Sequence, residues 1–575
     1  MKTLLPLLKK YRILCIVAPL FKMLEAAFDL TVPIIVASII DEGIGNGDKN
    51  FILSRCLLLV LMAALGLTCS IIAQFFAARA AVESSADLRH KLFSHIGSLS
   101  FSQTDKIGTS TLITRMTGDI NLVQNGVNMF LRLFLRSPFI VAGATVMAFF
   151  INKKIALAFA VAVVVLFIIV FGIMRVTNKM HKSVQYKMDD VTGAVRENIS
   201  GVRVIRAFGR EKSEVENFEN SNGILTKLQL KAGKISALMN PLTYVAVNLG
   251  IIAVVYIGAQ KVDGGTLLSG DVIALVNYMN QILVELVKLA NLVVLLSKAI
   301  AGMNRIEQVL DTECDMKFGT ATEGVTDSDE AVRFEGVSLR YSGSADESLT
   351  DISFEAKKGE TIGIIGSTGS GKSSLINLIP RFYDATSGYV SVFGRSAGEW
   401  EKNALRGRVA VVLQKAELFA GTVRSNLQWG KADATDEEMW QALKIAQAED
   451  FVKNLPNQLD EPVEQGGRNF SGGQKQRLTI ARGVIGNPEI LILDDSSSAL
   501  DYATDASLRT ALKELPKETT VFIISQRTFA VKNADKILVL DDGCLVGNGK
   551  HDELLENCEV YREIYESQFK EEAQQ

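Results

Sequence analysis

The feature that most constrains the fold of this chain is a long stretch without charge, from Cys56 to Ala78. A helix of about 20 apolar residues crosses the hydrocarbon core of a bilayer. The chain has five further apolar runs, two without charge and three interrupted by it: Ile155–Met174, Ile235–Gln260, Ile13–Ile40, Val127–Ile151 and Val272–Leu296. The first part of the chain therefore predicts a membrane α-helical domain with six transmembrane helices.

The gaps between these runs predict the orientation of the domain. Three short gaps alternate with two long polar gaps, Val82–Gly126 and Thr177–Lys234. An even number of spans places both chain ends and both long gaps on one side. The N-terminus and the long gaps are rich in Lys and Arg, which marks the cytoplasmic side. We expect a multi-pass protein of the cell membrane with a cytoplasmic N-terminus, although Lys153 and Lys154 in an outside gap depart from this rule.

Ionisable residues inside the apolar runs indicate a polar path through the membrane. A charge in the bilayer costs several kcal/mol unless it is paired or faces a cavity. Lys22 and Glu25 are three residues apart and can pair on one helix face. The whole polar set is Lys22, Glu25, Asp29, Arg132, Arg136, Asn277, Tyr278, Asn280, Gln281, Glu285 and Lys288. These residues indicate either internal ion pairs or contacts with an amphipathic substrate, and they do not identify a cargo.

The composition divides the chain into two unlike parts. Hydrophobic residues make up 48% and charged residues 22%, and the apolar residues concentrate in the first part. The formal net charge of −3 gives no basis for nucleic-acid binding. From Val332, short apolar strands alternate with helical stretches, which is typical of an α/β domain with a largely parallel sheet. We predict a transmembrane domain over residues 1–312, a linker over 313–330 and a cytoplasmic domain over 331–575.

A glycine-rich loop in the cytoplasmic domain predicts phosphate binding. The strand Thr361–Ile365 precedes the loop, an apolar helix follows it, and the loop residues are Gly366, Ser367, Thr368, Gly369, Ser370, Gly371, Lys372, Ser373 and Ser374. This is the spacing G-x-x-x-x-G-K-[ST] in the strand–loop–helix context that it requires. Backbone N–H groups close around phosphate oxygens, Lys372 reaches the β- and γ-phosphates, and Ser373 is expected to ligate Mg²⁺.

Two further segments fit a nucleotide site. Asp494 follows the apolar residues Ile490–Leu493, which suits a carboxylate that holds Mg²⁺ through water at a strand end. Phe470–Arg477 opens a helical segment, and its Ser-Gly-Gly core can cap the helix and present N–H groups to phosphate. Taken alone, this second segment is a weak indication, because the same residues are common in turns.

Arranged in this order, these residues resemble a half-transporter of the ATP-binding cassette (ABC) family. The type is the exporter with six membrane spans followed by an α/β P-loop nucleotide-binding domain, and the resemblance covers nearly the whole chain. Gly366–Ser374 corresponds to the Walker A loop, Leu493–Asp494 to the Walker B strand and Gln414 to the Q-loop. The resemblance implies ATP and Mg²⁺ as cofactors, with Ser373, Gln414 and Asp494 around the metal.

Other family positions are also recognisable. Tyr341 stands where the family stacks an aromatic ring on adenine, and Ser100–Lys106 and Arg206–Lys212 resemble its coupling helices. The signature and the D-loop correspond to Phe470, Ser471, Gly472, Gly473, Gln474, and to Ser498, Ala499, Leu500, Asp501. In this family two cassettes meet head to tail, and each ATP lies between the Walker A loop of one and the signature of the other. The resemblance therefore implies a second half-transporter chain as partner.

Two positions depart from the family pattern at its catalytic edge. The general base is a glutamate in the family and Asp495 here, and the switch histidine is replaced by Gln526. Aspartate withdraws the carboxylate by about 1 Å, and such a misplacement can cost about 100-fold in rate. The glutamine amide can donate a hydrogen bond but cannot become a cation. We interpret Asp495 and Gln526 as the catalytic positions of an impaired half-site.

The signature, in contrast, is intact, which favours a heterodimer. In such a pair the signature of this chain would complete a competent site on the partner. The leading hypothesis is a subunit of an ATP-driven exporter of amphipathic compounds or drugs, acting on membrane lipid or small amphipathic substrates. Alternatives are a lipid, peptide or metal-chelate transporter, which could be an importer, and a regulatory ATP-binding membrane subunit.

Overall fold

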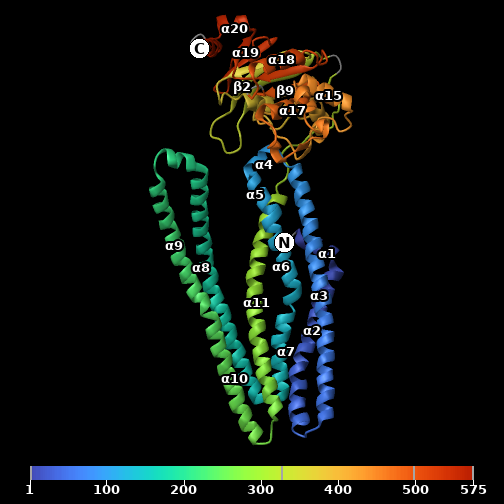
Figure 1. Ribbon diagram of the computed structural model, residues 1–575, viewed down its shortest axis with the longest axis vertical. Helices are drawn as coiled ribbons and strands as arrows, with labels where there is room; N and C mark the ends of the chain where they lie inside the picture. The colour runs from blue at the N-terminus through green and yellow to red at the C-terminus, as the bar shows by residue number, and fades with distance from the viewer. Residues whose placement is uncertain (1–2, 326–327, 497–498, 573–575) are drawn as a thin grey trace. The chain divides into compact units, whose positions relative to one another are not determined.

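The structure is a computed structural model that describes residues 3–325, 328–496 and 499–572. The chain forms two compact units (Figure 1). The first comprises Met1–Gly97 and Ser110–Thr312, and the second comprises Ser98–Thr109 and Glu313–Gln575. The short segment Ser98–Thr109 therefore belongs to the second unit, although it lies between two stretches of the first in sequence.

The described part of the first unit consists of helices. Asn152 caps the longest, α8, because its side chain accepts hydrogen bonds from the N–H groups of Lys154 at 3.0 Å and Ile155 at 3.3 Å. The elements are α1 (Leu4–Lys10), α2 (Arg12–Ser38), η1 (Ile39–Ile44), α3 (Lys49–Ser98), α5 (Thr109–Thr114), η2 (Arg115–Asp119), α6 (Ile120–Leu133), α7 (Arg136–Ile151), α8 (Lys153–Ala207), α9 (Glu211–Ala237), α10 (Met239–Asp263) and α11 (Ser269–Leu310).

Five helical segments of the described chain are long and apolar enough to cross a membrane. They are Arg12–Ile44, Lys49–Ser98, Thr109–Ile151, Lys153–Ala207 and Glu211–Asp263. The sixth predicted span, Val272–Leu296, lies on α11, which is not among them, so the predicted count of six is not confirmed. Helix α11 carries Glu285 and Lys288, and it buries more residues than the other helices of the unit.

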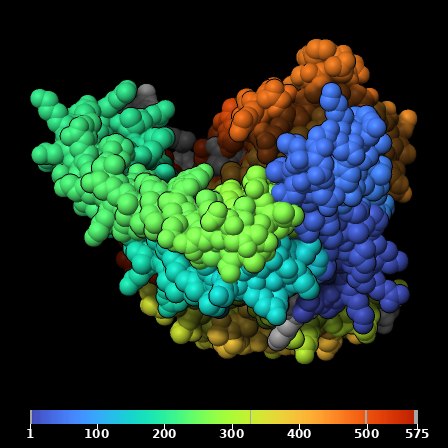
Figure 2. Space-filling view, turned by 90° about the horizontal axis from the view of Figure 1, so that it is seen from below, coloured from blue at the N-terminus to red at the C-terminus, as the bar shows by residue number. Residues whose placement is uncertain are grey.

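Helix α11 forms the core of the first unit together with α2, α7, α8 and α10. Tyr278, Ile282 and Phe159 are fully buried there. On the face seen in Figure 2, the light-green turn between α10 and α11 lies against the blue end of α2. At this contact the N–H of Gly270 donates to Asp41 Oδ1 at 2.7 Å, and a Cβ at Gly270 would lie 2.4 Å from the carbonyl oxygen of Ala37. Glycine therefore permits the close approach.

The second unit has two main sheets. The six-stranded sheet has the order β12-β11-β3-β10-β9-β6, in which β3, β6, β9, β10 and β11 run parallel. Its strands are β3 (Thr361–Gly366), β6 (Val409–Val412), β9 (Ile490–Asp494), β10 (Thr520–Ile524), β11 (Lys536–Asp541) and β12 (Cys544–Gly549). The antiparallel sheet β2-β1-β4-β5 and a short pair contain β1 (Glu330–Leu339), β2 (Leu349–Lys357), β4 (Ser387–Val392), β5 (Arg395–Ser396), β7 (Gly421–Thr422) and β8 (Pro462–Val463).

Helices complete the second unit and confirm the predicted α/β class. They are α4 (Phe101–Ile107), α12 (Lys372–Leu378), α13 (Lys402–Arg408), α14 (Val423–Leu427), α15 (Asp436–Ile445), α16 (Glu449–Lys453), η3 (Gln458–Asp460), η4 (Gln465–Gly467), α17 (Gly472–Val484), α18 (Tyr502–Leu512), α19 (Thr528–Val531), α20 (His551–Asn557) and α21 (Glu559–Glu572). In its described residues, 313–325 and 328–330, the predicted linker has little regular structure: β1 begins at Glu330, and Ala321 forms an isolated bridge with Trp400.

Helix α4 packs on the second unit through aromatic and polar contacts. Ser100 and Gln103 form a capping box at its start. The ring centroids of Phe101 and Phe382 are 4.6 Å apart, and the hydroxyl of Tyr383 donates to Asp105 Oδ2 at 2.6 Å. Burial and this hydrogen bond raise the pKa of Tyr383. The first segment that resembles a coupling helix is thus a short helix fixed to the second unit.

The contact between α6 and α11 supplies a test of the first unit. A Cβ at Gly126 would lie 2.3 Å from the Cβ of Ala299, whereas a Cβ at Gly66 on α3 would meet nothing within 4 Å. We expect Gly126→Val to destabilise the protein by about 1–3 kcal/mol, because a larger side chain forces the two helices apart. Gly66→Val is the matched control. Thermal unfolding followed by size-exclusion chromatography in detergent measures both, and equal unfolding temperatures would contradict the packing described.

Candidate nucleotide-binding site

Three neighbouring parallel strands bring the predicted site residues to one edge of the sheet. In the register, Ile524 at the end of β10 lies opposite Ile364 of β3 on one side and Asp494 of β9 on the other. The carboxyl ends of parallel strands meet at the same edge, so the loops that follow β3, β9 and β10 converge there. These loops carry the glycine-rich sequence, Asp495 and Gln526.

A cavity of about 340 Å³ lies at this edge. The predicted site residues that line it are Thr368, Gly369, Gly371, Lys372, Ser373, Ser374, Gln414, Asp494, Asp495 and Gln526. Other lining residues, including Ser348 and Gly543, come from the start of β2 and from the turn between β11 and β12. The structure therefore assembles in one place predicted site residues that lie far apart in sequence, such as Thr368 and Gln526, which are 158 positions apart.

The conformation of the glycine-rich loop explains its glycines. Gly369 and Gly371 have φ values of +88° and +93°, a region that other residues rarely adopt. A Cβ at Gly371 would also lie 2.6 Å from the carbonyl oxygen of Ser348. The side chain of Lys372 folds back over the loop, where its ammonium donates to the carbonyl oxygens of Gly366 at 2.8 Å and Ser367 at 2.6 Å. The Lys372 ammonium thus contacts three residues of the loop: Gly366, Ser367 and Ser370.

The charged groups of the cavity fit a nucleotide with a bound cation. Burial lowers the pKa of Lys372, and the Asp495 and Asp494 carboxylates only partly oppose this. Burial raises the pKa of both carboxyl groups. For Lys372, Asp494 and Asp495, the neighbouring groups therefore do not fully offset the cost of burying the charge. Phosphate oxygens would stabilise the charged form of Lys372, and a cation would stabilise the two carboxylates.

The donor set suits a hard cation such as Mg²⁺. The hydroxyl of Ser373 donates to Asp494 Oδ2 at 3.0 Å, so both side chains already point to one place. Across the described residues, no group of three or more His, Cys, Asp or Glu could hold a metal ion. A cation here would therefore depend on the Ser373 hydroxyl, the Asp494 carboxylate, the Gln414 amide and phosphate oxygens, all of which are oxygen ligands.

Asp495 and Gln526 follow the carboxyl ends of the neighbouring strands β9 and β10 and line the same cavity. Asp495 has a φ of +44°, and its N–H donates to the carbonyl oxygen of Ile524 at 3.0 Å. Its Oδ2 accepts a hydrogen bond from the Gln414 amide at 3.2 Å. On the other side, the hydroxyl of Thr368 donates to Gln526 Oε1 at 3.5 Å. The two departures from the family pattern thus face one site.

Tyr341 lies beside the glycine-rich loop but outside the cavity lining. Its hydroxyl donates to Ser374 Oγ at 3.1 Å, and its ring makes an edge-to-face contact with Tyr383 at 5.0 Å. The role of this ring against adenine stays a prediction.

The signature lies at the start of α17, away from the residues that line the cavity. Ser471 and Gln474 form a capping box, in which Ser471 Oγ accepts from the N–H of Gln474 at 3.3 Å and the N–H of Ser471 donates to Gln474 Oε1 at 2.9 Å. Ser471 and Gly472 are exposed, and a Cβ at Gly472 would meet nothing within 4 Å. Phe470, which is buried, anchors this turn in the core.

The D-loop lies next to the signature. A Cβ at Gly473 would be 3.1 Å from the carbonyl oxygen of Ala499, and Leu500 is buried beside it. Asp501 caps α18 by accepting the N–H of Thr504 at 2.9 Å. Ser498, the first predicted residue of this loop, lies outside the described residues.

The sequence interpretation missed one residue that contacts the Gln526 loop. Gln568 on α21 donates from Nε2 to the carbonyl oxygen of Gln526 at 2.7 Å. Its Oε1 accepts from the N–H of Thr528 at 2.9 Å and from the Thr528 hydroxyl at 2.8 Å. Thr528 is fully buried. A single glutamine on a polar C-terminal helix offers no sequence signal that it returns to this loop.

Comparison with known proteins agrees with both units. The family described as "ABC transporter transmembrane region" matches residues 15–286, and the family described as "ABC transporter" matches residues 349–498. The chain is 35% identical to the ABC transporter ATP-binding protein YfiB of Bacillus subtilis over 570 residues, which cover 99% of each chain. This chain is an ABC transporter.

Other relatives of this ABC transporter have more specific names. A putative multidrug export ATP-binding/permease protein of Staphylococcus aureus is 32% identical and matches 84% of this chain and 83% of its own length. An ATP-dependent lipid A-core flippase of Desulfotalea psychrophila is 31% identical over 84% of each chain. The structure of a bacterial Atm1-family ABC exporter with ATP bound has the same fold, with a TM-score of 0.79, 23% identity and coverage of 97% and 98%.

Membership in this family confirms the coarse predictions. The chain joins a multi-pass transmembrane region to an ABC ATP-binding domain, and such a domain implies ATP binding and ATPase activity coupled to transport. The helical domain has the exporter-type fold.

The contacts of Gln568 generate a prediction for this domain. We expect Gln568→Ala to weaken ATP binding several-fold, because it leaves the buried Thr528 hydroxyl and N–H without an acceptor and loosens the loop that holds Gln526. Gln568→Glu keeps the acceptor and should recover part of the affinity, whereas Ser567→Ala on the same helix is the neutral control. Equilibrium binding of a fluorescent ATP analogue measures all three, and unchanged affinity in Gln568→Ala would refute the expected role.

Proposed function

We propose that this chain is the impaired half of a heterodimeric ABC exporter that moves amphipathic compounds out of the cytoplasm. The observation that carries the proposal is the contrast within one domain: Asp495 and Gln526 occupy the catalytic edge of the cavity, while Ser471–Gln474 forms an intact and exposed signature. The putative drug exporter and the lipid flippase among the relatives support export of amphipathic molecules.

Each charged or polar residue of the cavity has an expected role toward bound ATP. When bound, MgATP would supply the γ-phosphoryl group whose hydrolysis drives transport. Lys372 and the loop amides would hold its phosphates, and Ser373, Asp494 and Gln414 would hold Mg²⁺. Asp495 would have to orient the attacking water, but its carboxylate is about 1 Å short of the position of a glutamate, which can lower the rate about 100-fold. This half-site would therefore hold ATP and hydrolyse it slowly.

The partner chain would complete both sites. An exposed helix start at Ser471 and Gly472 is suited to a phosphate of ATP bound to the partner. The first unit offers a further contact, because Phe208 at the turn between α8 and α9 is 76% exposed. Figure 1 shows α8 and α9 extending away from α6 and α11 toward that turn, which is the second segment that resembles a coupling helix.

The membrane topology is part of the same proposal. We assign residues 1–312 to the transmembrane domain, 313–330 to the linker and 331–575 to a cytoplasmic ATP-binding domain, with the N-terminus also cytoplasmic. Helix α11 would be the sixth span. Its polar residues are compatible with a membrane because Glu285 pairs with Lys288 at 2.9 Å and with Arg136 at 2.5 Å.

Restoring the family residues tests the impaired half-site. In the purified pair, Ser471→Ala should silence the site built on the partner, so that the remaining ATP hydrolysis belongs to the site of this chain. Adding Asp495→Glu and Gln526→His should then raise turnover by about 10- to 100-fold, because the carboxylate and the cation regain their positions. Steady-state phosphate release measures the change. If turnover does not rise although the partner carries a complete signature, the half-site is not impaired by these residues.

A further inference from the structure

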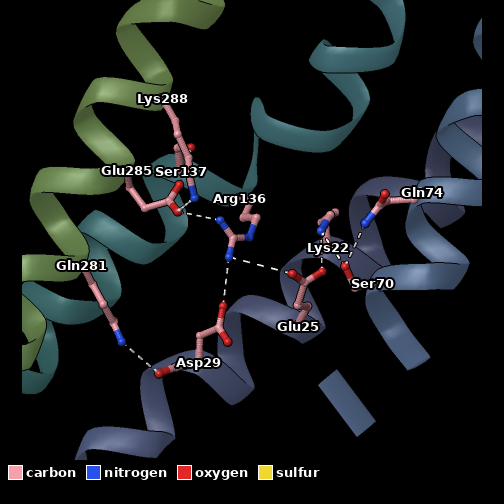
Figure 3. Close-up of polar contacts among 10 residues, drawn as sticks. All are labelled: Lys22, Glu25, Asp29, Ser70, Gln74, Arg136, Ser137, Gln281, Glu285 and Lys288. Atoms are coloured by element: carbon pink, nitrogen blue, oxygen red, sulfur yellow. Dashed lines mark hydrogen bonds and ion pairs between the residues drawn. The ribbon is translucent and has the colours of Figure 1, made fainter. Parts of the chain in front are cut away.

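Three irregular helices of the first unit meet at one cluster of charges (Figure 3). Pro33 lies inside α2 and has no N–H, so the carbonyl oxygen of Asp29 loses its usual helical partner. Gln281 of α11 donates to this oxygen at 3.3 Å. One turn away, the hydroxyl of Tyr278 donates to the carbonyl oxygen of Leu30 at 2.6 Å. The second irregularity is the break between α6 and α7, directly before Arg136. Broken helices at membrane depth are tolerated where they are buried or line a cavity.

Arg136 stands at the centre of the cluster, as Figure 3 shows. Its guanidinium bonds Asp29 at 2.9 Å and Glu285 at 2.5 Å and lies 3.8 Å from Glu25. Lys22 extends the cluster to Glu25 at 2.6 Å, and Lys288 extends it to Glu285 at 2.9 Å. The cluster therefore holds the cations of Lys22, Arg136 and Lys288 and the carboxylates of Glu25, Asp29 and Glu285, and its formal charge is zero.

Two residues of this network, Asp29 and Lys288, are much more exposed than the others. The side chains of Lys22, Glu25, Arg136 and Glu285 are 4–13% exposed, whereas those of Asp29 and Lys288 are 45% and 42% exposed. One exposed side chain is thus an anion and the other a cation. Both line a cavity of about 470 Å³, whose remaining wall includes the apolar residues Val32, Val36 and Val284. A cavity of this size is typical of small-ligand sites.

Two buried polar atoms of the same cavity lining have unmet hydrogen-bonding capacity. Within the described residues, neither Arg136 Nε nor Gln281 Oε1 has a hydrogen-bond partner. A buried donor and a buried acceptor without partners are costly, and in native structures they often mark a ligand or water site. Arg136 Nε can donate a hydrogen bond to an acceptor of a ligand, and Gln281 Oε1 can accept one from a donor. These two atoms therefore fit a ligand that has both an acceptor and a donor. The exposed side chains of Asp29 and Lys288 likewise fit a ligand that has both a cationic and an anionic group.

We propose that this cavity binds the head group of a zwitterionic amphiphile, with its ammonium group at Asp29 and its anionic group at Lys288. The apolar body of the ligand lies along Val32, Val36 and Val284. This inference deepens the proposed function and rests on it for one point, that the ligand is the cargo.

Electrostatics favours a zwitterion over a singly charged ligand. The network is already neutral, so a lone cation or anion would leave one unbalanced charge in a medium of low dielectric constant. A zwitterion adds one charge of each sign and keeps the site neutral. It also pairs with both exposed side chains at once, which a ligand of single charge cannot do.

Three single-chain probes with the same tail test the charge preference. The full chain is reconstituted in nanodiscs of phosphatidylglycerol, without ATP, and the equilibrium binding of hexadecylphosphocholine, hexadecyltrimethylammonium and hexadecyl sulfate is measured against empty nanodiscs. We expect the zwitterion to bind at least about tenfold more tightly than either singly charged probe. Equal or tighter binding of a singly charged probe overturns the proposal.

Two variants and two matched controls test which residue binds each charged group of the ligand. Asp29→Asn should weaken binding of the zwitterion about tenfold and shift the preference toward hexadecyl sulfate, and Lys288→Met should shift it toward the cation. Asp189→Asn and Lys182→Met make the same chemical changes at exposed positions of α8 and should have no effect. If Asp29→Asn and Lys288→Met weaken all three probes equally, or not at all, the assignment is wrong.

A competition experiment shows whether the ligand is a bilayer lipid or a free amphiphile. A separate transport measurement tests the proposed function independently of binding at the site. Phosphatidylethanolamine replaces part of the phosphatidylglycerol: competition with the zwitterionic probe identifies a lipid as the ligand, and its absence identifies a free amphiphile. Both results support a zwitterionic site. Vesicle transport is measured separately, so that intact binding preference without ATP-driven movement would refute the proposed function and leave the site standing.

Discussion

The parallel register of β9, β10 and β3 is the constraint on which the ATP-binding domain depends. It aligns Asp494, Ile524 and Ile364 at one sheet edge and so brings the loops with Lys372, Asp495 and Gln526 around one cavity. A slip of one residue would turn the buried Ile490–Leu493 side chains to the opposite face and move Asp494 away from Ser373. Apolar burial of these strands therefore fixes the geometry of the polar groups at their ends.

Local patterns predicted the parts of the site that depend on spacing. The spacing of the glycines and of Lys372 predicted a phosphate-binding loop between a strand and a helix, and the apolar run before Asp494 predicted a strand end. Contacts over long sequence distances were not predictable. Gln568 reaches the loop of Gln526 only because α21 returns across the sheet, and no local pattern shows that α4 packs on Phe382.

In the first unit, the lengths of the apolar runs predicted helices, but the positions of the charged residues did not predict which partners they contact. The charged residues of α2 and α11 were predicted as ion pairs or as substrate contacts, and Lys22 does pair with Glu25. The sequence could not show that Pro33 frees a carbonyl oxygen for Gln281, or that Arg136 joins carboxylates of two other helices.

The central claim is that the two ATP sites of the pair differ, with the slow one built on Lys372 and Asp495 of this chain. Vanadate trapping of 8-azido-ATP in the purified pair tests it most directly, because vanadate retains the nucleotide only where hydrolysis has occurred. We expect photolabel on the partner chain and little on this one. Equal vanadate-dependent labelling of both chains would contradict it.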